Sequence, residues 1–100
     1  MGIAPDGTTP RDAEAQADVC MANVRAVLKA APGGGLGMAH LVRINAYVTD
    51  RAHLAAYMRA RDRVLAAEAW PAGPPASTLM VVSGFARPEF LVEVEAVAAA

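Results

Sequence analysis

The sequence contains very little cysteine and few aromatic residues. Cys20 is the only cysteine among 100 residues, and aromatic side chains make up 5% of the chain. One cysteine cannot form an intramolecular disulfide or a site with several thiolate ligands, so both are excluded by count. Because such a chain suits a reducing compartment, the sequence predicts a cytoplasmic protein.

Long apolar runs and basic clusters are also absent. No stretch approaches the roughly 20 apolar residues that a membrane helix needs, and the N-terminus has no basic and apolar leader. The formal net charge is −1 at pH 7. Lys and Arg are not interleaved with aromatic residues, as they are on many nucleic-acid-binding surfaces. The sequence therefore predicts neither a membrane nor a nucleic-acid partner.

The residues that usually bind metals and phosphates lack the required spacing. His40 and His53 are not part of an HExxH pattern and have no carboxylate at ligand spacing. The glycine-rich segment 33–37 follows a predicted helix and precedes a predicted strand, which is the reverse of a phosphate-binding loop. We therefore expect no metal and no cofactor.

What the chain does contain is a high proportion of small apolar residues. Apolar residues make up 55% of the sequence and charged residues 19%, with alanine accounting for most of the apolar excess. A chain of 100 residues forms one domain and buries only about two-thirds of its unfolded surface. We expect a single domain over residues 1–100 that gains stability by oligomerising.

Capping residues and periodicity predict two helices and a strand. Asp12 is a candidate N-cap for a helix over 13–31, which the segment 32–35 ends. Residues 41–49 alternate, with Val42, Ile44, Ala46 and Val48 on one side. Asp50 then caps a second predicted helix over 51–69.

The last quarter of the chain predicts a β-hairpin. A β-branched and apolar run over 78–85 leads to a turn over 84–88, and residues 91–97 then alternate with Glu93 and Glu95 on one face. The predicted order is αβαββ. We expect an α+β fold in which two helices cover one face of a mainly antiparallel sheet.

Four segments together resemble the RidA/YjgF/YER057c family. Gln16 with residues 23–28 is similar to the family's Gln-x6-Asn helix, and residues 41–50 to a strand that ends in Val-x-Asp. Pro75-Ala76-Ser77-Thr78 resembles the segment that opens one family strand, and residues 92–98 resemble its closing Val-Glu-Val-Glu-Ala strand.

The resemblance implies a chorismate-mutase-like fold that assembles as a homotrimer with ligand clefts between subunits. Family members normally begin with an N-terminal β-hairpin, and this sequence begins just after the corresponding point. We therefore describe residues 1–100 as an N-terminally shortened RidA-like domain. Either a misplaced start or a shortened variant accounts for the difference.

The resemblance also implies which residues form the site. Family members that hydrolyse imines of amino acids use an arginine to hold the substrate carboxylate, and Ser77 stands at that position here. Met58 stands where the family commonly has asparagine. Glu93 matches the glutamate that orients water as a general base, although a solvent or subunit-contact role is the alternative; Glu95 is expected to be structural.

Two arginines are candidates to replace the missing cation. Arg43 lies on the polar face of the strand over 41–49, and Arg87 lies in the predicted turn beside Glu89. We expect Ser77, Arg43, Met58 and Arg87 to bind a ligand and Glu93 to be the catalytic candidate, with no metal.

Three functions compete. The first is binding of a small metabolite in a cleft between subunits, with activity on 2-imino acids weak or lost because Ser77 carries no charge. The alternative is an active imine or enamine hydrolase (deaminase) whose substrate lacks a carboxylate and contacts Glu93 and Ser77. Descriptions of the family as ribonucleases or translation inhibitors suggest a third function, action on RNA. The net negative charge of the chain argues against it.

Overall fold

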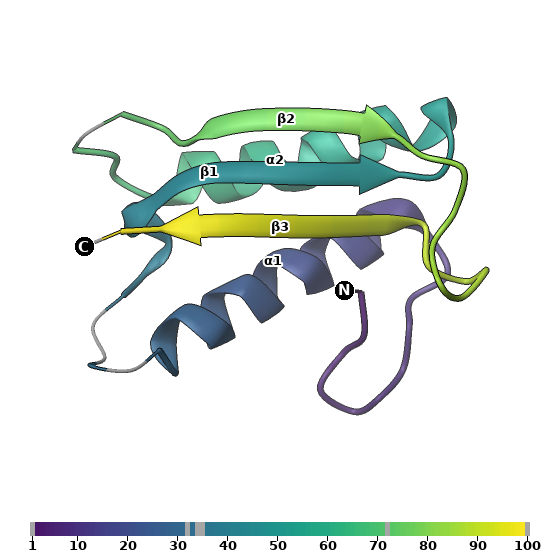
Figure 1. The fold of residues 1–100 in the computed structure, drawn as a ribbon, viewed down its shortest axis with the longest axis horizontal. Helices are drawn as coiled ribbons and strands as arrows, with labels where there is room; N and C mark the ends of the chain where they lie inside the picture. The colour runs from purple at the N-terminus through teal and green to yellow at the C-terminus, as the bar shows by residue number, and fades with distance from the viewer. Residues whose placement is uncertain (1, 32, 34–35, 72, 100) are drawn as a thin grey trace.

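The computed structural model describes residues 2–31, 33, 36–71 and 73–99. Its helices and strands follow the predicted αβαββ order, and both helices cover the same face of the sheet (Figure 1). The elements are α1 (Ala13–Lys29), β1 (Leu41–Val48), α2 (Leu54–Ala67), β2 (Ala76–Val81) and β3 (Val92–Ala98). In this part of the chain no helix is long and apolar enough to cross a membrane.

Helix α1 begins where the sequence predicts. The Asp12 carboxylate accepts a hydrogen bond from the Ala15 N–H at 2.9 Å, which satisfies one of the free donors of the first turn. The helix ends at Lys29, two residues before the predicted end. Of the predicted stop over 32–35 only Gly33 lies within the described residues, and the glycine-rich connector is likewise described only in part.

Strand β1 contains a β-bulge that the sequence analysis missed. The pairing of β1 with β3 shifts between Leu41 and Arg43. As a result Leu41 is 4% exposed whereas Val42 is 49% exposed. The prediction that Val42 shares the buried face with Ile44 and Ala46 was therefore wrong, because a bulge reverses the alternation of side chains beyond it.

The second helix connects two parallel strands. Asp50 caps a short 3-10 turn over Arg51–His53 by accepting the Ala52 N–H at 2.8 Å, and α2 follows. Strand β2 then pairs with β1 in the parallel direction. Parallel neighbours need a crossover connection, and α2 supplies it.

The predicted C-terminal hairpin does not form. The strand order is β2-β1-β3, so β1 lies between the two strands that were expected to pair (Figure 1). Strand β3 pairs antiparallel with β1. The sheet is thus mixed rather than mainly antiparallel. The connection over residues 82–91 is long for a hairpin, whose loops usually contain two to five residues.

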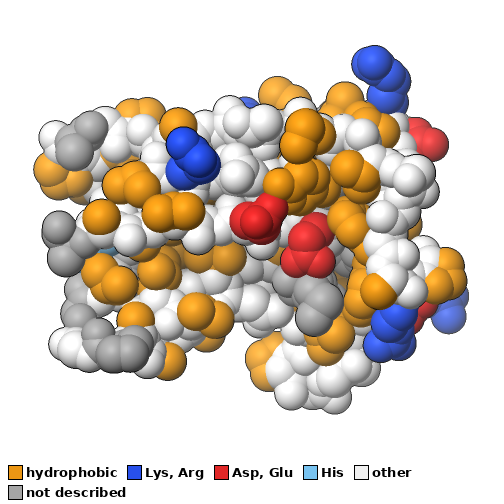
Figure 2. Space-filling model, viewed as in Figure 1, with side chains coloured by type: hydrophobic (Ala, Val, Ile, Leu, Met, Phe, Trp, Pro, Cys, Tyr) orange, Lys and Arg blue, Asp and Glu red, His pale blue; other side chains and the backbone are white. Residues whose placement is uncertain are grey.

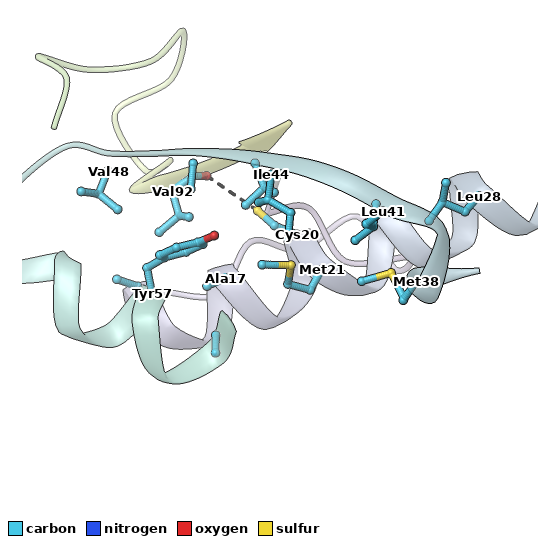
Figure 3. Close-up of a cluster of buried hydrophobic side chains, with 14 residues drawn as sticks. Ala17, Cys20, Met21, Leu28, Met38, Leu41, Ile44, Val48, Tyr57 and Val92 are labelled. Carbon is cyan, nitrogen blue, oxygen red and sulfur yellow. Dashed lines mark hydrogen bonds between the residues drawn. The ribbon is translucent and has the colours of Figure 1, made fainter. Parts of the chain in front are cut away.

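The core lies between the sheet and the two helices (Figure 3). Tyr57 of α2 is fully buried beside Cys20 and Ala17 of α1, under Val92 of β3. Cys20 is 1% exposed, its thiol donates a hydrogen bond to the Val92 carbonyl at 3.8 Å, and burial raises its pKa. Cys20 is therefore a core residue.

Gln16 connects three separate parts of the chain. Its side chain is fully buried, and Nε2 donates to the carbonyls of Pro10 and Glu89, each at 2.8 Å. Its Oε1 accepts the Leu91 N–H at 2.8 Å. Gln16 therefore joins α1 to the N-terminal segment and to the start of β3, and it satisfies backbone groups that would otherwise lack partners.

Candidate functional site

Among the described residues, no helix or strand packs on the face of the sheet that is turned away from α1 and α2 (Figure 1). We call this face the open face. Residues paired in register share a face, so three rows can be assigned from the pairing of β1 with its neighbours. The rows are Ala76–Arg43–Val97, Thr78–Asn45–Glu95 and Met80–Tyr47–Glu93. Figure 2 shows acidic side chains near the middle of this face with apolar side chains around them.

Glu93 lies in the third row with its side chain half-buried. Its partner across the ladder is Tyr47 of β1. The Tyr47 hydroxyl is hydrogen-bonded to Glu95, the diagonal neighbour, and this bond raises the pKa of Tyr47. The open face therefore contains two carboxylates and a phenol within one pair of strands.

Tyr47 was not among the site residues expected from the sequence. The interaction with Glu95 depends on the register between β1 and β3, which no local pattern reveals. A tyrosine on an alternating strand, with two alternating glutamates on another, is the signal that could have suggested the contact. We include Tyr47 in the candidate site.

Arg43 lies on the same face but at the other end of β1. Its partner on β3 is Val97, four residues from Glu93 along the strand. At about 3.4 Å per residue this separates the two positions by about 14 Å. Arg43 and Glu93 can therefore contact opposite ends of an extended ligand, but the structure does not bring them together around a small one.

Ser77 lies on the other face of the sheet from Glu93. It pairs with Ile44, whose side chain is 1% exposed beneath the helices, so the Ser77 side chain leaves the sheet on the helix side. It remains exposed because β2 is an edge strand. Ser77 and Glu93 of one chain thus do not face a common space.

Met58 and Arg87 lie apart from the open face. Met58 is 40% exposed on α2, in the helix layer behind the sheet. In the connection between β2 and β3, Arg87 forms an ion pair with Glu89, with Nε and Oε1 2.5 Å apart. Its guanidinium also lies over the Phe90 ring, 5.2 Å from the centroid. Arg87 is already engaged by its own neighbours.

The described residues contain no group of three His, Cys, Asp or Glu side chains that could hold a metal ion. A groove of about 250 Å³ lies between α1 and β3, on the helix side of the sheet. We call it the α1–β3 groove. It is lined by Cys20, Asn23, Val24, Val27, Leu28, Val94 and Ala96. None of the site residues expected from the sequence lines it.

Gln16 and Asn23 of α1, which form the Gln-x6-Asn pattern, have structural roles. Gln16 forms the three hydrogen bonds described above, and the Asn23 side-chain amide donates to the Ile3 carbonyl at 2.9 Å. Both side chains hold the N-terminal segment against the helix. Their seven-residue spacing, about two helical turns, places them on the same side of α1.

A family model described as "Endoribonuclease L-PSP" matches residues 1–100. Together with the fold, this match decides the family. The chain belongs to the RidA/YjgF/YER057c family. None of the curated proteins searched matches the chain.

Several solved structures superpose on the chain. A protein of unknown function from Pseudomonas aeruginosa is 41% identical with a TM-score of 0.76 over 93% of this chain. The YjgF gene product of E. coli is 26% identical with a TM-score of 0.83, over 97% of this chain and 72% of its own. E. coli TdcF, solved with bound serine, shares the fold with a TM-score of 0.85 at 23% identity. It aligns over 99% of this chain and 74% of its own.

These three proteins are longer than the chain. The chain spans 61% of the length of the P. aeruginosa protein. What the complete relatives bind or catalyse is therefore not carried over to this chain by the match alone.

Proposed function

We propose that this chain is a RidA-family protein that binds a small metabolite in a cleft between subunits, with activity on 2-imino acids weak or lost. One observation carries the proposal: serine occupies position 77, where the family resemblance implies the carboxylate-binding arginine. An arginine fork binds a carboxylate through two charged hydrogen bonds, whereas a serine hydroxyl donates one neutral bond.

The register of the sheet supports the same proposal. Ser77 and Glu93 project from opposite faces of one chain, so a site that uses both must be completed by a second subunit. Arg43 and Arg87 do not supply the missing charge next to Glu93, because one lies at the far end of the open face and the other pairs with Glu89. Without an arginine at position 77, the proposed cleft between subunits favours an apolar or weakly polar ligand.

Hydrolysis of 2-iminopropanoate, generated in situ, tests the proposal. We expect the wild-type chain to be no faster than its Glu93→Ala variant. Restoring the charge with Ser77→Arg is expected to raise kcat/KM by at least about tenfold, since a charged hydrogen bond contributes about 1.5–3 kcal/mol. The rate of imine loss, followed by trapping the imine with semicarbazide, measures both effects.

Ser77→Met is the matched control, because it adds a side chain of comparable length without charge. Both variants alter an exposed edge residue and should leave the fold intact. Wild-type turnover well above the Glu93→Ala rate would contradict the proposal. Equal rates for Ser77→Arg and Ser77→Met would show that the arginine position does not control carboxylate binding.

The arrangement of Glu93 and Tyr47 supports a second candidate, an imine or enamine hydrolase whose substrate lacks a carboxylate. The half-buried Glu93 carboxylate can orient a water molecule, and the phenol of Tyr47 beside it can donate a proton. A panel of neutral imines and enamines tests this function. Turnover that disappears in Glu93→Gln would support it, and a panel without turnover would exclude it for the substrates used.

We further propose that the open face is the subunit interface of a homotrimer. It carries apolar side chains that no helix covers, among them Met80 and Val97, which are 47% and 53% exposed. Light scattering should give three times the 10.3 kDa mass of one chain. Met80→Lys should dissociate the assembly, whereas Met58→Lys, a similar change in the helix layer, should not.

A mass of one chain for the wild type would exclude the trimer. Dissociation by Met58→Lys alone would place the interface on the helix layer instead. The carboxylates of the open face do not favour an RNA backbone as its occupant, because like charges repel.

A further inference from the structure

One end of the sheet contains a pocket that the candidate site does not include. The start of β1, the start of β2 and the end of β3 lie together at this end (Figure 1). The pocket has a volume of about 450 Å³, within the roughly 300–1,000 Å³ of usual small-molecule sites. We call it the strand-end pocket. Its lining includes His40, Val42, Pro71, Gly73 and Ala99.

Backbone hydrogen bonds hold the walls of the strand-end pocket. The Ala99 N–H donates to the His40 carbonyl at 3.0 Å, which ties the end of β3 to the start of β1. The Gly73 N–H donates to the Trp70 carbonyl at 2.9 Å and closes the turn that carries Pro71. Gly73 has a φ of 88°, a left-handed conformation that glycine adopts without steric cost. The pocket is therefore built from backbone groups that already have partners and not from a free strand edge.

The β-bulge of β1 supplies an apolar wall of the pocket. Leu41 and Arg43 pair with successive residues of β3, and Val42 is the extra residue between them. Bulges often re-aim a side chain beside a functional site. Val42 lines the pocket together with Pro71 and Ala99. These side chains favour a ligand with a compact apolar body.

His40 supplies a hydrogen-bond donor at the pocket. Its Nδ1 accepts the Gly37 N–H at 2.9 Å, so the proton of the neutral imidazole is on Nε2. The ring is half-buried, and no group in the described part of the chain accepts a hydrogen bond from Nε2. A ligand that contacts this nitrogen must therefore offer an acceptor.

Arg43 adds a positive charge beside the pocket. It lies on the open face opposite Val97, and Ala99 follows two residues later on the same side of the chain. Two residues of a strand span about 7 Å, a distance that an arginine side chain can reach. Arg43 is exposed and forms no ion pair with a described residue. Because none of the described lining residues is acidic, the charges at the pocket favour an anion.

We propose that the strand-end pocket binds a small organic anion with a compact apolar body. His40 and Arg43 hold the negative group, and the body packs on Val42. A monocarboxylate with a branched hydrocarbon chain has this chemistry. The site is separate from the cleft between subunits around Ser77 and Glu93 and does not rest on the function proposed there.

Titration of the isotope-labelled chain with 4-methylpentanoate, followed by amide NMR shifts, tests the proposal. We expect saturable shifts centred on Val42, Gly73 and Ala99, with a Kd of about 1 mM or below. The neutral isostere 4-methylpentanamide should bind at least about tenfold more weakly, because it loses the charged hydrogen bond to Arg43. The cation 4-methylpentan-1-amine should not bind.

Single substitutions test each contact. Arg43→Met removes the charge and keeps an unbranched side chain, and Val42→Glu puts a negative charge on the apolar wall. Each should weaken binding by at least about tenfold. His40→Phe removes the donor and should weaken binding by about threefold to tenfold. Arg51→Met and His53→Phe, beyond the other end of β1, are the matched controls and should bind as the wild type does.

Two further variants keep the test decisive. Arg43→Met and Val42→Glu change exposed side chains, so they report on binding even if His40→Phe disturbs the contact with Gly37. Glu93→Gln, which changes the cleft between subunits, should leave the affinity unchanged. The strand-end pocket and the function proposed for the cleft can therefore fail independently.

The proposal is wrong if no saturable shifts occur up to about 10 mM carboxylate, ten times the weakest Kd expected. Equal affinities for the carboxylate and the amide, or for Arg43→Met and the wild type, would show that the pocket does not select an anion. Loss of binding in Glu93→Gln would assign the ligand to the cleft between subunits instead.

Discussion

Replacing Gln16 with methionine is expected to lower the free energy of unfolding by about 3–5 kcal/mol. The substitution keeps the length of the side chain but removes both polar atoms. The carbonyls of Pro10 and Glu89 and the N–H of Leu91 then lose their partner in a buried position. Each buried group left unsatisfied costs about 1–3 kcal/mol.

Guanidinium unfolding followed by circular dichroism measures the effect, at one fixed protein concentration because assembly adds to apparent stability. Lys29→Met changes a polar residue to methionine on the exposed surface of the same helix and should shift stability by no more than about 0.5 kcal/mol. One ordinary hydrogen bond contributes about 1 kcal/mol. If Gln16→Met lowers the free energy of unfolding by less than this, Gln16 does not hold the three segments together as described.

Replacing Tyr57 with phenylalanine should have the opposite effect and stabilise the chain by about 1–2 kcal/mol. Tyr57 is fully buried, and its hydroxyl is the one buried side-chain polar atom without a hydrogen-bond partner in the described part of the chain. Phenylalanine keeps the ring in the core and removes the unsatisfied group. Tyr57→Ala, which leaves a cavity instead, should cost about 3–5 kcal/mol.

The pH dependence of stability distinguishes two reasons why Tyr57→Phe could be stabilising. One is removal of the unsatisfied hydroxyl, and the other is better packing of the core. Burial raises the pKa of Tyr57 from 10.0 to about 12. The unfolded chain therefore releases this proton first as the pH rises, and the stability present below pH 10 is lost between pH 10 and about 12. Tyr57→Phe should lack that loss. Equal pH profiles for the two proteins, measured by urea unfolding, would contradict the assignment.

Local features of the fold are predictable from the sequence. Asp12 and Asp50 begin their helical segments because a carboxylate can accept a free backbone N–H within two or three residues. Alternation in β1 and β3 identifies both strands for a similar reason, since side chains on a strand point to opposite faces in turn. These features depend on residues close together in the chain.

Local sequence patterns do not predict which strands pair with each other. Strand β2 is adjacent in sequence to β3, and the turn residues between them favour a hairpin. The α2 crossover instead places β2 parallel to β1, and β3 takes the other edge of β1. The choice depends on pairing the backbone groups along both edges of β1, which is a property of the whole sheet.

In the candidate site, too, the sequence identifies the residues and the structure decides where they lie. The sequence identifies Glu93, Arg43 and Ser77, and the family resemblance gives each a possible role. Only the pairing reveals that Ser77 lies on the other face from Glu93 and that Arg43 lies at the far end of the open face. Because a shift of one residue in register moves a side chain to the other face, composition and spacing cannot settle such placements.

By itself, the sequence determined the family of this chain, the order of its helices and strands, and the serine that replaces the expected arginine. The tertiary structure decided which strands are neighbours, which candidate residues share a face, and that Gln16 connects the N-terminal segment, α1 and the start of β3. The physical reason is distance along the chain. Capping and alternation act over a few residues, whereas strand pairing joins residues more than 30 positions apart and Gln16 contacts residues more than 70 positions away.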